Sequence, residues 1–109
     1  MSEVYMHIAA ANFYLLSETG IKEPDVSEAL EKTVTAKADV IGWLKRSLDA
    51  VKTARSQLKP GDLERKVKIE GKVATVDGMY LRIIVHANEH MGQLVAYARM
   101  TGVAPPWSK

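Results

Sequence analysis

Residues 82–93, Arg-Ile-Ile-Val-His-Ala-Asn-Glu-His-Met-Gly-Gln, contain two of the three histidines in this chain of 109 residues. Apolar and polar residues recur here at the spacing of an α-helix, so the stretch predicts the middle of a long helix. Residues four apart lie about 40° apart around a helix, so His86 and His90 point to one side. His7 is the candidate third ligand of a metal site. Three neutral imidazoles with one open position are typical of a catalytic zinc-type centre.

One face of the same predicted helix carries polar side chains over several turns. On a helical wheel all of them lie within about 40° of His86. The remaining surface is largely apolar, so we expect the polar face to line an internal cavity, where each polar group needs a partner. A metal ion would be the partner of the imidazoles. The residues on this face are Arg82, His86, His90, Gln93 and Tyr97.

Three polar residues near the histidines are candidates for catalytic roles. Glu89 lies on the flank of His86 and fits an orienting partner of the imidazole or a proton acceptor. Tyr97 is a second candidate for proton transfer, and Arg82 is placed to hold an anionic group of a substrate. The simpler interpretation is that Tyr97 packs through a hydrogen bond and that Arg82 pairs with a surface acid.

The pattern His86-x-x-Glu89-His90 also matches the inverzincin protease motif, in which the glutamate is the general base. That motif needs a further carboxylate ligand well downstream. No aspartate or glutamate follows Glu89 in the sequence, so the protease interpretation fails for lack of a ligand.

The other helices follow from apolar spacing and from the residues that end helices. Residues 3–19 predict a first helix that is apolar around most of its girth, and residues 26–33 predict a short one. A long helix is expected over residues 35–58. The last helix starts at Thr75, a candidate N-cap, and runs to Thr101. The expected fold is therefore all-α with three main helices.

Two finer features of the packing follow from the same patterns. Apolar residues of the long helix alternate by three and four, which indicates a bundle seam with one charged interruption. Residues 62–74 alternate briefly around Gly71, and we interpret them as a structured loop rather than a strand. The seam consists of Ile41, Leu44, Leu48, Val51, Arg55 and Leu58.

Composition limits the class of protein. A length of 109 residues predicts a single domain over residues 1–109. The net charge is +2 and the basic residues are scattered among acidic ones, so no nucleic-acid-binding face is expected. The absence of cysteine leaves His, Asp and Glu as metal ligands. No stretch is apolar enough for a signal peptide or a membrane span, so we expect a cytoplasmic protein without membrane contact.

Three stretches of the chain resemble a known family of metalloenzymes, the DinB-like (DinB/YfiT) family. The longest is residues 86–108, His-Ala-Asn-Glu-His-Met-Gly-Gln-Leu-Val-Ala-Tyr-Ala-Arg-Met-Thr-Gly-Val-Ala-Pro-Pro-Trp-Ser. Residues 7–14, His-Ile-Ala-Ala-Ala-Asn-Phe-Tyr, are similar to the segment that carries the family's first histidine. Residues 37–47 resemble the intervening helix. Together these stretches cover much of the chain.

The resemblance implies a bundle of helices with a divalent metal held by His7, His86 and His90. Characterised relatives include thiol-dependent transferases, so a small thiol is the implied co-substrate and a metal-dependent S-transferase is the implied activity. Imidazole ligands suit zinc or nickel first, with manganese or iron as alternatives. The competing interpretation is a non-catalytic helical bundle, an interaction or structural protein that retains the family's metal site.

The resemblance also implies that one helix is absent, because the family's bundle normally begins before the helix of the first histidine. His7 lies only six residues after the start of the sequence. Three helices would leave an apolar groove exposed, which a monomer seldom tolerates. We therefore expect a second copy of the chain to cover the groove in a two-fold homodimer.

Overall fold

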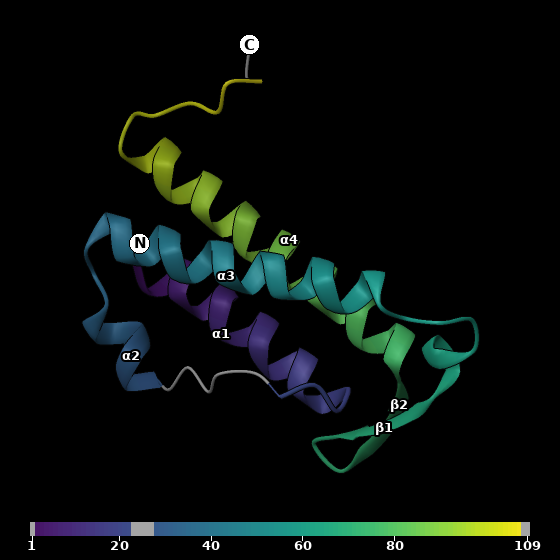
Figure 1. The fold of residues 1–109 in the computed structure, drawn as a ribbon. Helices are drawn as coiled ribbons and strands as arrows, with labels where there is room; N and C mark the ends of the chain where they lie inside the picture. The colour runs from purple at the N-terminus through teal and green to yellow at the C-terminus, as the bar shows by residue number, and fades with distance from the viewer. Residues whose placement is uncertain (1, 23–27, 108–109) are drawn as a thin grey trace.

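The computed structural model describes residues 2–22 and 28–107, and helices dominate these ranges (Figure 1). The expected all-α fold is confirmed, with helix ends within about two residues of those predicted. Residues 26 and 27 of the predicted short helix lie outside the described ranges. The helices are α1 (Ser2–Glu18), α2 (Glu28–Thr33), α3 (Lys37–Ser56) and α4 (Val76–Met100).

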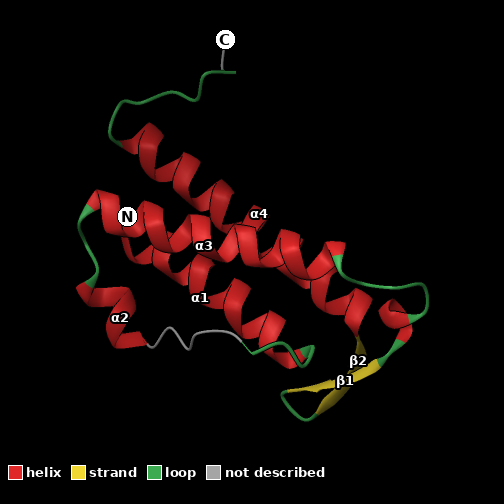
Figure 2. Cartoon of the chain, in the orientation of Figure 1, coloured by secondary structure: helices red, strands yellow, loops and turns green. Residues whose placement is uncertain are grey.

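Helix α1 occupies the centre of the molecule, because it packs against α2, α3 and α4. Figure 2 shows α1, α3 and α4 as three long helices, with the small sheet at one end of the bundle. The buried side chains of α1 lie on the side of the helix that faces α3 and α4. Among them, Leu16 has none of its surface exposed. This placement brings His7 on α1 beside the middle of α4.

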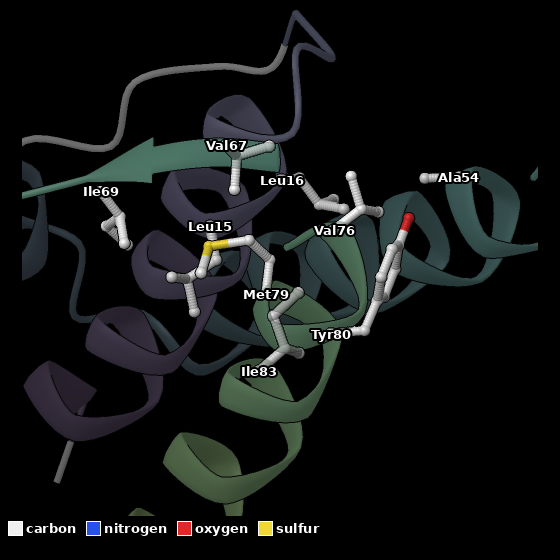
Figure 3. Packing of buried hydrophobic residues seen from close by; sticks show 9 residues of the cluster. All are labelled: Leu15, Leu16, Ala54, Val67, Ile69, Val76, Met79, Tyr80 and Ile83. Atoms are coloured by element: carbon white, nitrogen blue, oxygen red, sulfur yellow. The ribbon is translucent and has the colours of Figure 1, made fainter. Parts of the chain in front are cut away.

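The larger core cluster lies where α1, α3, α4 and the sheet meet (Figure 3). Its side chains come from segments that are far apart in the sequence, so its burial holds α1, α3, α4 and the sheet together. A second cluster joins α1 to α3 through Met6, Phe13 and Val40. The larger cluster contains Leu15, Leu16, Ala54, Val67, Ile69, Val76, Met79, Tyr80 and Ile83.

The seam expected on α3 is only partly right: Val51 and Leu58 pack against the larger core cluster, but Ile41 and Leu48 do not. The buried residues of helix α3 are Val40, Ser47 and Ala54, each seven positions after the one before. Ile41 and Leu48, by contrast, are 40% and 42% exposed. Ser47 accepts a hydrogen bond of 3.1 Å from the side-chain amide of Asn12 on α1. Small side chains on α3 leave room for α1 and for this buried polar contact. Large apolar residues therefore remain partly in solvent.

The loop expected over residues 62–74 is also wrong, because it contains a short helical turn and a β-hairpin. Strand β1 (Lys66–Ile69) pairs antiparallel with β2 (Lys72–Thr75). The two residues between the strands, Glu70 and Gly71, both have positive φ, as a two-residue hairpin turn of type I′ requires. Alternation buries Val67 and Ile69 against the core, so the hairpin closes the end of the bundle.

Helix α4 begins and ends as expected. The hydroxyl of Thr75 accepts a hydrogen bond of 3.1 Å from the amide of Gly78, so the predicted N-cap is confirmed. Gly102, with φ of +87°, follows the helix in the left-handed conformation that glycine adopts most easily. No helix in the described ranges is both long enough and apolar enough to cross a membrane.

Candidate metal centre

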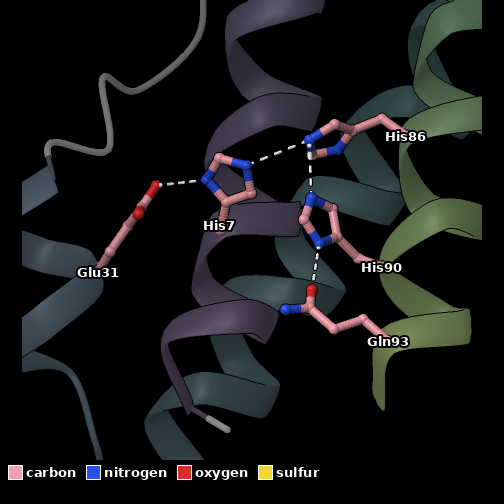
Figure 4. Close-up of polar contacts among 5 residues, drawn as sticks. All are labelled: His7, Glu31, His86, His90 and Gln93. Carbon is pink, nitrogen blue, oxygen red and sulfur yellow. Dashed lines mark hydrogen bonds and ion pairs between the residues drawn. The ribbon is translucent and has the colours of Figure 1, made fainter. Parts of the chain in front are cut away.

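The three histidines meet between α1 and α4, as the sequence predicts (Figure 4). His86 Nε2 lies 3.2 Å from His7 Nε2 and 3.2 Å from His90 Nε2. One ring comes from the start of the chain and two come from the middle of α4. The packing of α1 against α4 therefore brings histidines that are far apart in the sequence into one cluster.

Hydrogen bonds from two of the rings fix which nitrogens face the centre. His7 Nδ1 is 3.2 Å from a carboxylate oxygen of Glu31, and His90 Nδ1 is 2.8 Å from the amide oxygen of Gln93. Both oxygens accept, so both Nδ1 atoms carry the proton and donate. In the neutral form of each ring, the Nε2 atom then presents a lone pair toward the centre. Such lone pairs are ligands for a cation, or acceptors for a proton on His86 Nε2.

Two of the three separations between the Nε2 atoms fit a tetrahedral metal ion. Zinc–imidazole bonds of about 2.0–2.1 Å at tetrahedral angles place the ligand nitrogens about 3.3 Å apart. The two observed separations are 3.2 Å. The third pair, His7 and His90, has its ligand atoms within 4.8 Å, so small side-chain movements would close the site around a cation of this size. Three protein ligands would leave a fourth position open.

His86 differs from the other two rings because its Nδ1 atom is buried without a hydrogen-bond partner among the described residues. Burial lowers the pKa of His86 below the ordinary value of 6.5, and the neighbouring His90 and His7 lower it further. The charge of Glu89 acts in the opposite direction. The net effect favours the neutral ring, which is the form that binds metal.

We expect the metal-free protein to lose stability on acidification, in part through His86. The unfolded chain binds the His86 proton more readily than the folded chain does. This contribution is therefore fully present above pH 6.5 and is lost as the pH falls from there toward the lower folded pKa. Urea unfolding with a chelator present, at a series of pH values, measures the effect. The same pH dependence in His86→Ala would contradict the assignment to His86.

The other candidate residues lie around the cluster in different ways. Tyr97 accepts a hydrogen bond of 2.8 Å from Gln93, so it is one step removed from His90. A guanidinium nitrogen of Arg82 lies 3.8 Å from the carboxylate of Glu70, which agrees with the simpler interpretation of a surface ion pair. Glu89 is exposed on the flank of His86.

Sequence reasoning missed Glu31, which holds His7 from helix α2. Glu31 lies 24 positions after His7 in a stretch of ordinary helix-forming residues, and no motif marks it. Only the packing of α2 against α1 brings the two together. A carboxylate behind a ligating imidazole is a common arrangement in metal sites, because it fixes the tautomer and strengthens the ligand.

The fold and the three-histidine cluster together define a DinB-like protein with a candidate metal site. Residues 12–105 match the family model described as "Protein of unknown function (DUF1572)", and the chain belongs to this DinB-like family. A crystal structure described as a DinB-like protein from Bacillus cereus ATCC 10987 has a TM-score of 0.78 and 24% identity. That similarity covers 99% of this chain and 72% of the other. No curated protein matches the chain.

Proposed function

We propose that this protein is a metal-dependent enzyme that holds one divalent ion through His7, His86 and His90. The observation that carries the proposal is the convergence of three imidazoles whose ligand atoms lie within 4.8 Å of one another, with two Nε2–Nε2 separations of 3.2 Å. Zinc or nickel suits these ligands best. A small thiol is the co-substrate that the family resemblance suggests, and S-transfer is the corresponding reaction.

Accessibility supports a reactive site over a closed structural one. The side chain of His7 is 46% exposed, so solvent reaches the cluster from the side of α1. Structural zinc sites usually have four protein ligands, whereas catalytic sites keep one position for water or substrate. The described residues supply three ligands that could hold a metal ion together.

In a transfer reaction, the metal and the residues around the cluster would have separate roles. A bound divalent ion lowers the pKa of water or a thiol in its open position and so supplies a nucleophile near neutral pH. Glu31 and Gln93 hold the rings of His7 and His90 by accepting from their Nδ1 atoms. In this proposal Glu89, on the flank of His86, would accept a proton. Arg82, one turn before His86, would leave its contact with Glu70 to hold an anionic part of the substrate.

Metal uptake tests the proposal directly. Protein made without a histidine tag, stripped with a chelator and dialysed against zinc or nickel, is expected to retain one equivalent of metal. Elemental analysis by mass spectrometry gives the stoichiometry. Asp49→Asn, on the solvent side of α3, should retain the same amount and serves as the matched control. Retention of less than a tenth of an equivalent by the parent chain would reject the site.

A non-catalytic protein that retains the metal site is the second candidate function. This role is favoured because two of the candidate catalytic side chains already have partners within the chain. Tyr97 accepts a hydrogen bond from Gln93, and Arg82 lies beside Glu70. The two candidates separate in a screen of small thiols with electrophilic acceptors. Metal-dependent turnover that Glu89→Gln reduces supports the enzyme. Full metal occupancy without turnover supports the structural role.

A further inference from the structure

The outer face of α4, which points away from the core, is apolar and exposed. Four large apolar residues on this face have about half or more of their surface exposed to solvent. They are Leu81 at 62%, Ile84 at 61%, Val85 at 55% and Met91 at 49%. The buried residues of α4, among them Met79 and Ile83, lie on the opposite face. An apolar stripe of this length on a soluble protein marks a contact surface.

The spacing of the stripe is that of a helix-pairing seam. Leu81, Val85, Asn88, Gly92 and Val95 follow one another by four, three, four and three residues, which is the heptad pattern. A seam of this kind faces one partner helix along its whole length. Its centre is Asn88, and single polar residues at such central positions set the register of helix pairs.

Charged residues on this face occur only at its two ends. Asp77 precedes the stripe and Arg99 follows it, and each lies eleven residues from Asn88. The other charged residues of α4, Arg82 and Glu89, lie on the side of the histidines, about 100–120° away from Asn88 around the helix. An antiparallel copy of the same helix, centred on Asn88, would therefore meet opposite charges at both ends.

We propose that a second copy of this chain packs on the outer face of α4, antiparallel and related by a two-fold axis at Asn88. Leu81 then lies near the partner subunit's Val95, and Ile84 lies near the partner subunit's Gly92. Asp77 lies near the partner subunit's Arg99. Such a two-fold contact uses the same surface on both copies, so every favourable pair occurs twice.

Gly92 provides an independent reason for a close partner. Nothing in the chain lies within 4 Å of the position that a Cβ atom would occupy there, so the fold of one copy does not require glycine. Glycine inside a helix costs about 0.5–1 kcal/mol relative to alanine. In the proposed dimer the missing side chain makes room for the partner subunit's Ile84. The charge pattern favours a second copy over an unrelated apolar partner, because the acidic end of this face on one copy meets the basic end on the other.

A cysteine at the axis tests the proposal, because the chain contains no cysteine. Helices that pack about 8–10 Å apart, with Cα atoms about 2.3 Å from each axis, bring the two copies of residue 88 within about 5 Å. That separation suits a disulfide. Mild oxidation of Asn88→Cys is expected to give a disulfide-linked dimer at least ten times faster than oxidation of Leu81→Cys. The two copies of residue 81 would lie about 21 Å apart along the helices.

The mass of the unmodified chain in solution gives the second readout. Light scattering at micromolar concentration is expected to give the mass of two chains, and Val85→Asp is expected to give the mass of one with unchanged helix content. A monomeric parent chain would overturn the proposal. Equal cross-linking at residues 81 and 88 would also overturn it, because it would indicate random collision. Both measurements are made with and without a chelator, so failure of the metal site does not affect them.

Discussion

Replacing His86 with alanine is expected to abolish tight metal binding while the helical fold remains. His86 is the ring that approaches both others, since its Nε2 atom lies 3.2 Å from those of His7 and His90. Loss of a hydrogen-bond partner behind a ligand already costs about 10–100-fold in metal affinity, so loss of the ligand itself should cost more than about 100-fold. Competition with a chromophoric chelator measures the affinity, and circular dichroism verifies the fold.

A graded partner variant sharpens this prediction. Glu31→Gln keeps an acceptor for His7 but removes its charge, and it should weaken binding by about tenfold at the lower end of the range for such partners. Asp49→Asn changes the net charge equally and lies far from the cluster on the solvent side of α3, so its affinity should match the parent. An unchanged affinity in His86→Ala would mean that the metal binds elsewhere.

The second large effect is on stability, at Leu16. This side chain is fully buried in the cluster that joins α1 to α4 and the hairpin. Leu16→Ala is expected to lower the free energy of unfolding by about 2–5 kcal/mol, through lost burial and the cavity that remains. Urea unfolding of the metal-free protein measures the change. Much of the stability of a domain of this size would be lost.

Leu48→Ala is the matched control for Leu16→Ala, because it removes the same atoms from a residue that is 42% exposed. We expect it to change the free energy of unfolding by less than about 1 kcal/mol. The comparison also tests the register of α3. A loss at Leu48 as large as that at Leu16 would mean that the larger apolar residues of α3 face the core of the single chain.

The candidate ligands were predictable from sequence because of a local rule. His86 and His90 share a helix face by their spacing alone, and the chain has only one other histidine to join them. Their convergence with His7 depends on the packing of α1 on α4, which helix spacing does not specify. Glu31 was not predictable, since its contact with His7 arises from the placement of a short helix over a separation of 24 residues.

The two incorrect predictions about the fold, the seam on α3 and the loop over residues 62–74, have related causes. On α3 the apolar pattern favoured Ile41 and Leu48, but close packing of α1 selects the smaller Ser47 and Ala54. In the hairpin, the strands are four residues each and carry four charged or polar side chains, so their periodic signal was weak. Gly71 marked the turn, yet the positive φ of Glu70 beside it could not be read from its type.

X-ray absorption spectroscopy of the zinc-loaded protein tests the central claim most directly, because it reports the kind and distance of the atoms that hold the metal. Three imidazoles from two helices predict nitrogen neighbours at about 2.0–2.1 Å, with the outer-shell scattering of three histidine rings and one further light atom. Replacing His7 with alanine should remove one ring from that signal. A spectrum with one imidazole or none, unchanged in the His7 variant, would contradict the account.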